Sequence, residues 1–471
     1  MPEERLDAPL PAHGRAELPV WRDVSFPPAE RVADLLARMT LPEKVGQLYS
    51  TWLQSDTADG EVAPHQDDLA DGPPGGTGWA EVIRDGLGQL TRPFGTRPMT
   101  GRQGALALVQ LQRDVMAASR FGIPALAHDE CLAGFIAWTA AIYPVPLSWG
   151  ASFDPGLVEH MARQIGASMR SVGVHQGLAP VLDVTVDPRW GRTEETIGED
   201  PYLVATVGTA YVRGLESTGL VSTLKHFVGY SASRGGRNLA PAAVTSRQLA
   251  DQLLPPFEMA IRLGGARSVM HAYTDIDGIP TASDPTLLSG LLREAWGFTG
   301  TVVADYFGIS FLELLHQVAA GPAQAAGLAL AAGVDVELPT VRCYGAPLLS
   351  AVRDGSVSEA LVDRAATRVL RQKFELGLLD PSWDPVPDAL TSGLDDGLND
   401  GLDDGLAERE VDLAPPAARA LARQLAEESV VLLANDGTLP IKSGPVALAG
   451  PRIAVVGPRA DDPYAMLGCY S

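Results

Sequence analysis

The sequence predicts an α/β protein whose main domain is a parallel (β/α)8-type, TIM-like barrel. Short apolar runs alternate with helix-length amphipathic stretches between about residues 120 and 340. The runs are apolar along most of their length, as in parallel strands covered by helices. Six or more such units in about 250 residues favour a closed barrel, with an open doubly wound sheet as the alternative. The runs are 122–130, 175–184, 221–230, 266–275, 300–308 and 333–339.

The helices between these strands carry start signals. Three helices are expected to begin with a capping aspartate followed by proline, at 154–155, 200–201 and 284–285. Upstream of the barrel strands, Thr40 and Glu43 form the pattern of a capping box, in which each side chain bonds the other residue's backbone amide. These signals support helices placed between the apolar runs.

Residues 51–100 differ from the alternating region because they are rich in Gly, Pro and Asp. The glycine run at 71–78 does not follow a clear strand and lacks the Lys-Ser/Thr ending of a phosphate-binding loop. We therefore expect a surface loop there.

The chain is expected to have four segments. Residues 413–471 should contain a helix over 416–436 and a buried strand over 453–458. One helix and one strand cannot bury a core, so we expect most of a second α/β domain to be missing. The segments are an N-terminal extension (1–29), the catalytic barrel (30–385), an acidic Gly/Asp-rich linker (386–412) and the incomplete start of the C-terminal domain (413–471).

Charge and composition exclude several classes of protein. With 58 acidic and 36 basic residues, the net charge is −22, which argues against a nucleic-acid or anionic-membrane partner. Three scattered cysteines fit a reducing compartment better than a disulfide framework or a four-thiolate zinc site. The N-terminus shows no apolar signal segment, and 318–334 is interpreted as a packed helix. We expect a cytoplasmic protein with no cofactor and no metal ion.

Polar side chains end every predicted strand. In a barrel of parallel strands these ends meet at one mouth, where catalytic groups lie. A single polar residue at a strand end often marks only where the chain meets water, but six such ends together predict a site. The residues are His128, Asp129, Glu130, Asp183, Lys225, His226, His271, Tyr273, Asp305, Tyr306, Asp335 and Glu337.

Asp305 is the strongest candidate for chemistry because it follows a buried apolar strand. A carboxylate on a rigid strand can attack the anomeric carbon of a sugar, the alternative being a structural cap for the next helix. Lys225 and His226 could donate hydrogen bonds to sugar hydroxyls, unless they form a surface ion pair. The guanidinium of Arg192 can donate two hydrogen bonds at once, to hydroxyls or to a carboxylate. Apolar ring faces, for a sugar or for packing alone, are offered by Trp190 and Tyr306.

At these residues the sequence resembles glycoside hydrolase family 3. The matching stretches are GIPALAHDECLAG, DPRWGRTEETIGEDP, LKHFVGY, VMHAYTDIDG and VVADYFG, in the family's order and with similar spacing. The resemblance covers roughly residues 30–380 and continues into IAVVGPRADDP. It implies an exo-acting, retaining β-glycosidase on a barrel followed by an α/β sandwich domain. The implied substrate is an oligosaccharide or an aryl or alkyl β-glycoside ending in a non-reducing β-D-xylosyl or β-D-glucosyl residue, cleaved through a covalent glycosyl-enzyme.

The resemblance also implies roles for individual residues. Asp305 is the implied catalytic nucleophile. Arg234 is an alternative to Arg237, because the glycine-rich segment around them shifts the match by a few residues. The implied substrate-binding residues are Glu130, Arg192, Lys225, His226, Arg237, Tyr273 and Tyr306.

Two features depart from the family's common pattern. Most members have Asp where this sequence has Glu130, and the longer side chain resembles the β-xylosidase-like branch. A pentose lacks the C6 hydroxymethyl, so a tighter pocket would favour it. A retaining enzyme also needs an acid/base carboxyl about 5–5.5 Å from the nucleophile. The family mostly supplies it from the second domain, so we expect it beyond Ser471, and we expect Glu194 and Glu195 to pair with Arg192.

Other interpretations stay open at this point. A metal-dependent hydrolase on the same barrel would use imidazoles and a carboxylate to activate water. A barrel without its partner domain could also be an inactive sugar-binding remnant, and the oligomeric state is open, a homo-oligomer included. The candidate metal-site residues are His128, His175, Lys225, His226, His271 and Asp305.

Overall fold

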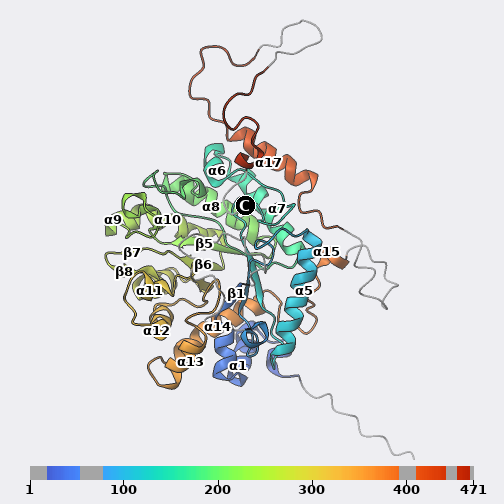
Figure 1. The fold of residues 1–471 in the computed structure, drawn as a ribbon, viewed down its shortest axis with the longest axis vertical. Coiled ribbons are helices and arrows are strands. Elements are labelled where there is room, and N and C mark those ends of the chain that lie inside the picture. The colour runs from blue at the N-terminus through green and yellow to red at the C-terminus, as the bar shows by residue number, and fades with distance from the viewer. Residues whose placement is uncertain (1–17, 53–77, 392–409, 442–452, 467–471) are drawn as a thin grey trace, which may run out of the picture.

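The computed structural model describes residues 18–52, 78–391, 410–441 and 453–466, and its centre is a sheet of seven parallel strands (Figure 1). Every neighbouring pair in the sheet is parallel, in the order β1-β2-β3-β4-β5-β6-β9. The strands are β1 (Ser50–Trp52), β2 (Gln89–Thr91), β3 (Leu126–Asp129), β4 (Gln176–Gly177), β5 (Val221–Phe227), β6 (Ser268–His271) and β9 (Thr301–Val303).

Residues 335–337 close the sheet into a barrel. The amide of Ala304, just after β9, donates to the carbonyl of Val336 at 2.8 Å, and the amide of Ser50 in β1 donates to the carbonyl of Glu337 at 3.0 Å. Parallel bridges join the same segments on both sides. The predicted closed barrel is therefore confirmed over the open sheet, because an open sheet would leave β1 and β9 as unpaired edges.

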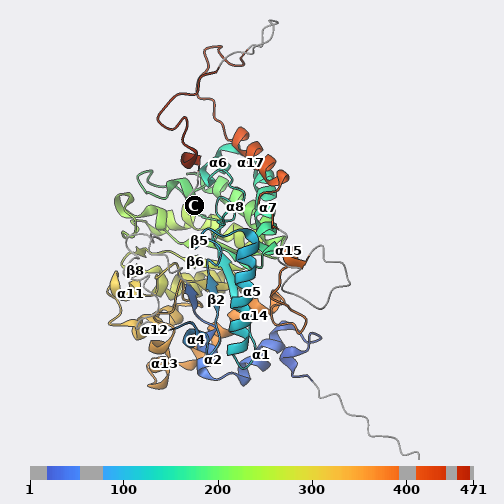
Figure 2. The ribbon, with the colours of Figure 1, turned by 45° about the vertical axis from the view of Figure 1, so that its right-hand side comes forward.

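Helices surround the barrel (Figure 2), and α2, α7 and α8 begin where the sequence predicted. Asp154 and Asp200 accept hydrogen bonds from the amides of Leu157 (2.9 Å) and Leu203 (2.8 Å). The helices are α1 (Pro28–Arg38), α2 (Leu41–Gly46), α4 (Trp79–Val82), α5 (Gly101–Ala118), α6 (Pro146–Ser152), α7 (Pro155–Ser171), α8 (Pro201–Glu216), α9 (Ser246–Gln248), α10 (Pro255–Met259), α11 (Phe311–Leu314), α12 (Pro322–Ala332), α13 (Ala346–Arg353), α14 (Glu359–Glu375), α15 (Asp388–Thr391) and α17 (Pro416–Glu428).

Shorter and wider helical turns complete the described elements. The capping box at Thr40 and Glu43 is present at the start of α2. Two short strands, β7 (Asp275–Ile276) and β8 (Ile279–Pro280), form an antiparallel pair. The 3-10 turns are η1 (Val20–Arg22), η2 (Thr193–Glu195), η3 (Tyr230–Ala232), η4 (Arg234–Gly236), η7 (Thr281–Ser283) and η9 (Pro463–Met466). The π-helical turns are η5 (Leu249–Leu253), η6 (Ala260–Gly264) and η8 (Thr286–Ala295).

Hydrogen-bonded polar side chains occupy part of the barrel interior. Gln176 in β4 donates to the hydroxyls of Thr223 in β5 (2.8 Å) and Ser268 in β6 (3.0 Å), and it accepts from Gln89 in β2 (3.3 Å). All four residues are buried. These hydrogen bonds link β4 to β2, β5 and β6 across the barrel interior, and they avoid the cost of unpaired buried polar groups.

The predicted surface loop at 71–78 lies almost entirely outside the described residues, but the region around it contains elements that the sequence analysis did not predict. Residues 53–77 lie outside the described residues, but 78–100 contain α4 and the barrel strand β2. The short strand β2 carries the polar residues Gln89 and Thr91, so neither an apolar run nor a strand-length alternation marked it in the sequence.

The C-terminal residues form one packed helix. α17 lies against α6 and α7, with Ala418 and Leu425 buried, and ends at Glu428 rather than 436. The predicted buried strand over 453–458 was wrong, because Ile453 and Val456 are 71% and 85% exposed and no described strand pairs with them. A strand needs a partner for its backbone groups. The repeat of the predicted linker lies outside the described residues, and the domain boundaries stay predictions.

Within the described residues, no helix is both long and apolar enough to cross a membrane. The apolar stretch that the sequence assigned to a packed helix contains α12, whose residues Ala325, Ala326 and Ala329 are buried against the barrel core.

Candidate active site

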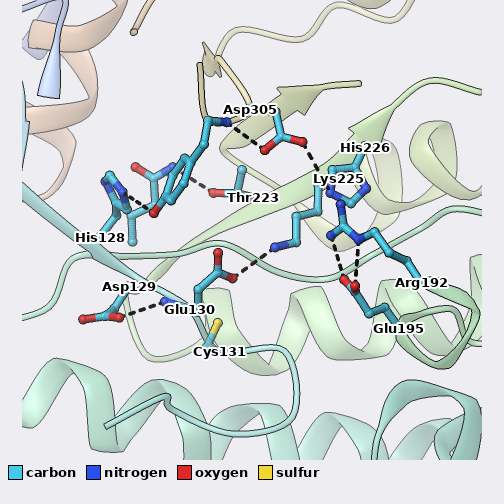
Figure 3. Close-up of polar contacts among 12 residues, drawn as sticks. His128, Asp129, Glu130, Cys131, Arg192, Glu195, Thr223, Lys225, His226 and Asp305 are labelled. Carbon is cyan, nitrogen blue, oxygen red and sulfur yellow. Dashed lines mark hydrogen bonds and ion pairs between the residues drawn. The ribbon is translucent and has the colours of Figure 1, made fainter. Parts of the chain in front are cut away.

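Several predicted site residues meet at the carboxyl ends of the barrel strands (Figure 3). Glu130 directly follows β3, Lys225 and His226 lie near the end of β5, and Asp305 comes two residues after β9. All four are buried. The barrel thus places side chains from distant parts of the sequence around one point, as expected for the catalytic end of this architecture.

Asp305 has one carboxylate oxygen held and one free of protein hydrogen bonds. Its Oδ1 accepts from the backbone amide of Tyr306 at 2.8 Å. Its Oδ2 is buried with no hydrogen-bond partner among the described residues, and lies 3.7 Å from His226 Nε2 (Figure 3). Most buried polar atoms are paired, so an unpaired carboxylate oxygen in a ring of polar groups indicates a group kept available for a ligand.

The pKa of Asp305 reflects a balance of burial and positive charge. Burial raises this pKa from its usual 3.8 to about 6, against the opposing charges of Arg192 and Lys225 and the hydrogen bond from the Tyr306 amide. Above about pH 6 the carboxylate is therefore ionised, which is the state that a nucleophile requires.

Lys225 and Glu130 form a buried ion pair across the mouth of the barrel. Lys225 Nζ donates to Glu130 Oε2 at 3.0 Å, with side-chain exposures of 2% and 5%. The pair joins the end of β3 to β5. The alternative of a surface ion pair at Lys225 is therefore excluded, and the buried pair lies beside Asp305 and His226 at the barrel mouth (Figure 3).

Arg192 is held in place by Glu195. Its Nε and one terminal nitrogen donate to the two carboxylate oxygens, both at 2.7 Å. This bidentate geometry confirms the predicted pairing for Glu195, whereas the pairing of Glu194 stays a prediction. The guanidinium also lies 5.4 Å from the ring centre of Tyr230, within cation–π distance. Arg192 is thus oriented before any ligand binds.

The aromatic residues divide between the site and the core. Tyr273 Oη donates to the carbonyl of Tyr306 at 2.7 Å, which links β6 to the segment that carries Asp305. The ring of Tyr306 packs against Trp52 with centres 5.5 Å apart. Trp190 is 2% exposed with its ring against Tyr230, so its role is packing.

Two predicted assignments remain separate from this cluster. Arg237 is exposed, and its Nε lies 3.4 Å from the carbonyl of Arg234, which is also exposed. The choice between them as a substrate-binding residue stays a prediction.

The candidate metal site is not supported, since no group of three His, Cys, Asp or Glu side chains within the described ranges is placed to hold a metal ion.

The histidines of the candidate metal site have other partners. His175 Nδ1 accepts from the amide of Ala127 at 3.0 Å, and His271 Nδ1 lies 2.8 Å from the carbonyl of Ala272. His128 Nδ1 lies 2.7 Å from Gln89 Oε1. Burial lowers the pKa of all three, to about 3, 4 and 3 respectively, so the rings are neutral at pH 7.

Three residues near the site had no individual role in the sequence analysis, although Asp183 was among the strand-end residues that predicted the site. Asp183 Oδ2 lies 2.8 Å from His226 Nδ1 and accepts from the His226 amide at 3.0 Å. Tyr230 packs edge-on against His226 and Tyr273, with centres 5.0 and 5.7 Å apart. Trp52 borders Tyr306. The position of Asp183 at a strand end was visible, but its partner required the folded structure.

Residues 40–372 match the family described as "Glycosyl hydrolase family 3 N terminal domain". A β-xylosidase of Formosa agariphila is 32% identical over 393 residues, which cover 77% of this chain and 51% of the relative. A periplasmic β-glucosidase of Salmonella typhimurium is 32% identical over 455 residues, which cover 93% of this chain and 52% of the relative. The chain thus spans about half the length of these relatives.

Solved structures show the same similarity. A β-glucosidase from Erythrobacter marinus superposes with a TM-score of 0.74 at 35% identity, over 90% of this chain and 52% of that one. A β-glucosidase from Listeria innocua in complex with glucose gives a TM-score of 0.72 at 28% identity, over 88% of this chain and 53% of that one.

Proposed function

The chain belongs to glycosyl hydrolase family 3, and we propose that it is an exo-acting, retaining β-glycosidase that removes terminal non-reducing β-D-xylosyl or β-D-glucosyl residues. One observation carries the proposal. Asp305 presents a carboxylate oxygen without a protein partner at the barrel mouth, close to His226 and under the positive charges of Arg192 and Lys225. Such a carboxylate is suited to attack a carbon that develops positive charge.

In this proposal Asp305 attacks the anomeric carbon and forms an ester bond to it, while the bond from that carbon to the leaving oxygen breaks. Water then attacks the same carbon and releases the sugar with its original configuration. Arg192, Lys225 and His226 bond the hydroxyls of the sugar, and Tyr273 holds the segment that carries the nucleophile. We assign no acid/base to the described residues, and its location beyond Ser471 stays a prediction.

Glu130 supports a preference for the pentose. It adds one methylene to the shorter side chain that most of the family is expected to have, and its carboxylate is already engaged by Lys225 at 3.0 Å. A larger buried side chain leaves less room for a C6 hydroxymethyl group. We propose that xylosides are turned over more efficiently than glucosides. Relatives bearing both names are similar to this chain, so the comparison must be made by measurement.

A mechanism-based label tests the proposal. The chain is incubated at pH 7 with an aryl 2-deoxy-2-fluoro-β-xyloside that carries a dinitrophenolate leaving group, which departs with little protonation. We expect one sugar per chain by intact mass, mapped to the peptide that contains Asp305. The Asp305→Asn variant is the matched control and should stay unlabelled. Sugar binding without any labelling would contradict hydrolysis and favour a sugar-binding protein.

The location and the assembly of the protein are separate proposals. Cys131 and Cys343 are buried free thiols, which agrees with the proposal of a reducing, cytoplasmic compartment. Fractionation of the native source with a compartment marker would test it. The proposed partner is the glycoside substrate alone, and light scattering of the purified chain would determine whether it forms a homo-oligomer.

A further inference from the structure

Asp183 lies behind His226, on the side of the ring away from Asp305, and we propose that it is a positioning residue for substrate binding. It holds the hydrogen of the His226 ring on Nδ1, so that Nε2 accepts a hydrogen bond from one hydroxyl of the bound sugar. This inference rests on the proposed glycosidase function and adds a requirement to it: the sugar must carry a hydrogen-bond donor at that position.

The contact geometry supports this assignment. A single oxygen of Asp183, Oδ2, lies 2.8 Å from His226 Nδ1 and 3.0 Å from the His226 backbone amide nitrogen. The two side chains are each 1% exposed. The ring is further held by the edge-on contact with Tyr230, whose centre lies 5.0 Å away. The imidazole therefore has one orientation, with Nδ1 toward Asp183 and Nε2 toward the site.

The chemistry of the pair determines which nitrogen carries the hydrogen. Burial raises the pKa of Asp183 to about 7, so its carboxylate is ionised at pH 8.5. An ionised carboxylate only accepts hydrogen bonds, so its hydrogen bond with the His226 ring then requires the hydrogen on Nδ1. The ring is neutral because burial, together with the charges of Arg192 and Lys225, holds the pKa of His226 well below its usual value. Nε2 therefore carries a lone pair.

That lone pair faces the nucleophile. His226 Nε2 lies 3.7 Å from Asp305 Oδ2 (Figure 3). When Asp305 is ionised, both atoms are acceptors, and neither can satisfy the other. A group that donates a hydrogen bond satisfies one of them, and a sugar hydroxyl is such a group. The arrangement is thus complete only when a donor enters the site.

The neighbouring residue on β5 has the opposite role. The ammonium group of Lys225 is only a donor. A hydroxyl can accept from Lys225 and donate to His226 at once, whereas a fluorine cannot donate and a hydrogen does neither. Lys225 and His226 together thus select for a hydroxyl, one as a hydrogen-bond donor and the other as an acceptor. Asp183 makes His226 Nε2 the acceptor, although it does not itself contact the sugar.

Nitrogen NMR of the full chain labelled with ¹⁵N-histidine tests the proposal without any activity measurement. The His226→Gln variant assigns the two ring nitrogens of His226. We expect a protonated Nδ1 and an unprotonated Nε2 at pH 8.5, where Asp183 is ionised. A hydrogen on Nε2, on its own or together with one on Nδ1, would overturn the proposal. Because this measurement uses the unmodified protein, it stands even if an Asp183 variant fails to fold.

Substrate analogues test the consequence for specificity. Aryl β-xylosides with each ring hydroxyl replaced in turn by hydrogen or by fluorine are compared by kcat/KM. At one position both replacements should lower kcat/KM by roughly 10- to 100-fold. In Asp183→Ala this selectivity should shrink to a few-fold, while the penalties at the other positions stay unchanged. Equal penalties in Asp183→Ala and the unmodified chain would contradict the proposal.

A matched control and a separate readout keep the outcomes distinct. Ser222→Ala removes a buried hydrogen bond to Glu216 from the other end of β5 and should leave the analogue selectivity unchanged. If Asp305 is never labelled and no glycoside is hydrolysed, the proposed function fails, and the NMR result still decides the state of His226. If labelling occurs but His226 carries its hydrogen on Nε2, only the present inference fails.

Discussion

Replacing Asp305 with asparagine is expected to stabilise the protein while it abolishes the labelling of the nucleophile. The carboxylate is buried, with its side chain 11% exposed, and its Oδ2 has no hydrogen-bond partner among the described residues. The negative charge of Asp305 therefore lowers the free energy of unfolding of the protein. Asparagine has nearly the same shape but stays neutral at every pH, so the variant removes the cost and retains the packing.

The size of the effect follows from the pKa of Asp305. The interval between its usual value of 3.8 and about 6 corresponds to about 3 kcal/mol, at 1.36 kcal/mol for each pH unit. Because the folded-state pKa lies above the unfolded one, the unmodified protein loses stability as the pH rises through this interval, and the loss is complete above about pH 6. The variant should therefore gain about 3 kcal/mol at pH 8 and about 1 kcal/mol at pH 4.5.

Urea unfolding of the full chain, at pH 4.5 and pH 8, measures this difference between the two proteins. Asp335→Asn serves as the control with the opposite sign, since Asp335 is also buried, at 1% side-chain exposure, but bonds Arg293 at 2.6 Å and Arg368 at 2.8 Å. That variant should lose stability at both pH values. If Asp305→Asn is less stable than the unmodified protein at pH 8, the charges of Arg192 and Lys225 outweigh burial, and the reasoning is refuted.

Three further predictions follow from the same contacts. The rate at which a fluorosugar labels Asp305 should fall about tenfold per pH unit below about pH 6, and a rate independent of pH between 4.5 and 7 would contradict a nucleophile with this pKa. Glu130→Gln should cost about 3–5 kcal/mol in urea unfolding, because the Lys225 ammonium loses its carboxylate, and adding Lys225→Met should restore most of it; additive losses would argue against a coupled pair. Lys373→Met should cost about 3 kcal/mol or more, since the buried amino group, whose pKa burial lowers to about 7, donates to Gln47 Oε1 and to two backbone carbonyls. The exposed Arg371→Met on the same helix should change stability by less than about 0.5 kcal/mol.

Parts of the barrel that follow local rules were predicted well from the sequence. The strand before Asp305 shows an apolar run with a polar end, and the helices after Asp154 and Asp200 show their capping residues. In contrast, β1 and β2 were missed. Each is short, and the side chains of Ser50 and Gln89 are polar because the barrel interior uses hydrogen bonds between strands. No apolar period marks such strands.

The candidate site was predicted as a set of residues but without its contacts. The strand-end rule selected Glu130, Lys225, His226 and Asp305, and the structure brings them together. It could not reveal that Asp183 bonds the ring of His226, or that Trp52 packs on Tyr306. These pairs come from different strands, and their contact depends on how the strands are aligned across the barrel.

By itself, the sequence determined the family, the strand–helix alternation and the acidic residue at the end of a buried strand, because apolar patterning and capping act over a few neighbouring residues. Only the tertiary structure decided that Lys225 bonds a carboxylate 95 residues away and that His226 Nε2 faces Asp305 Oδ2. Those distances depend on closure of the barrel and on the register of parallel strands, which join segments far apart in the chain. The protonation and reactivity of the candidate nucleophile follow from that closure, since burial and nearby charge exist only in the folded state.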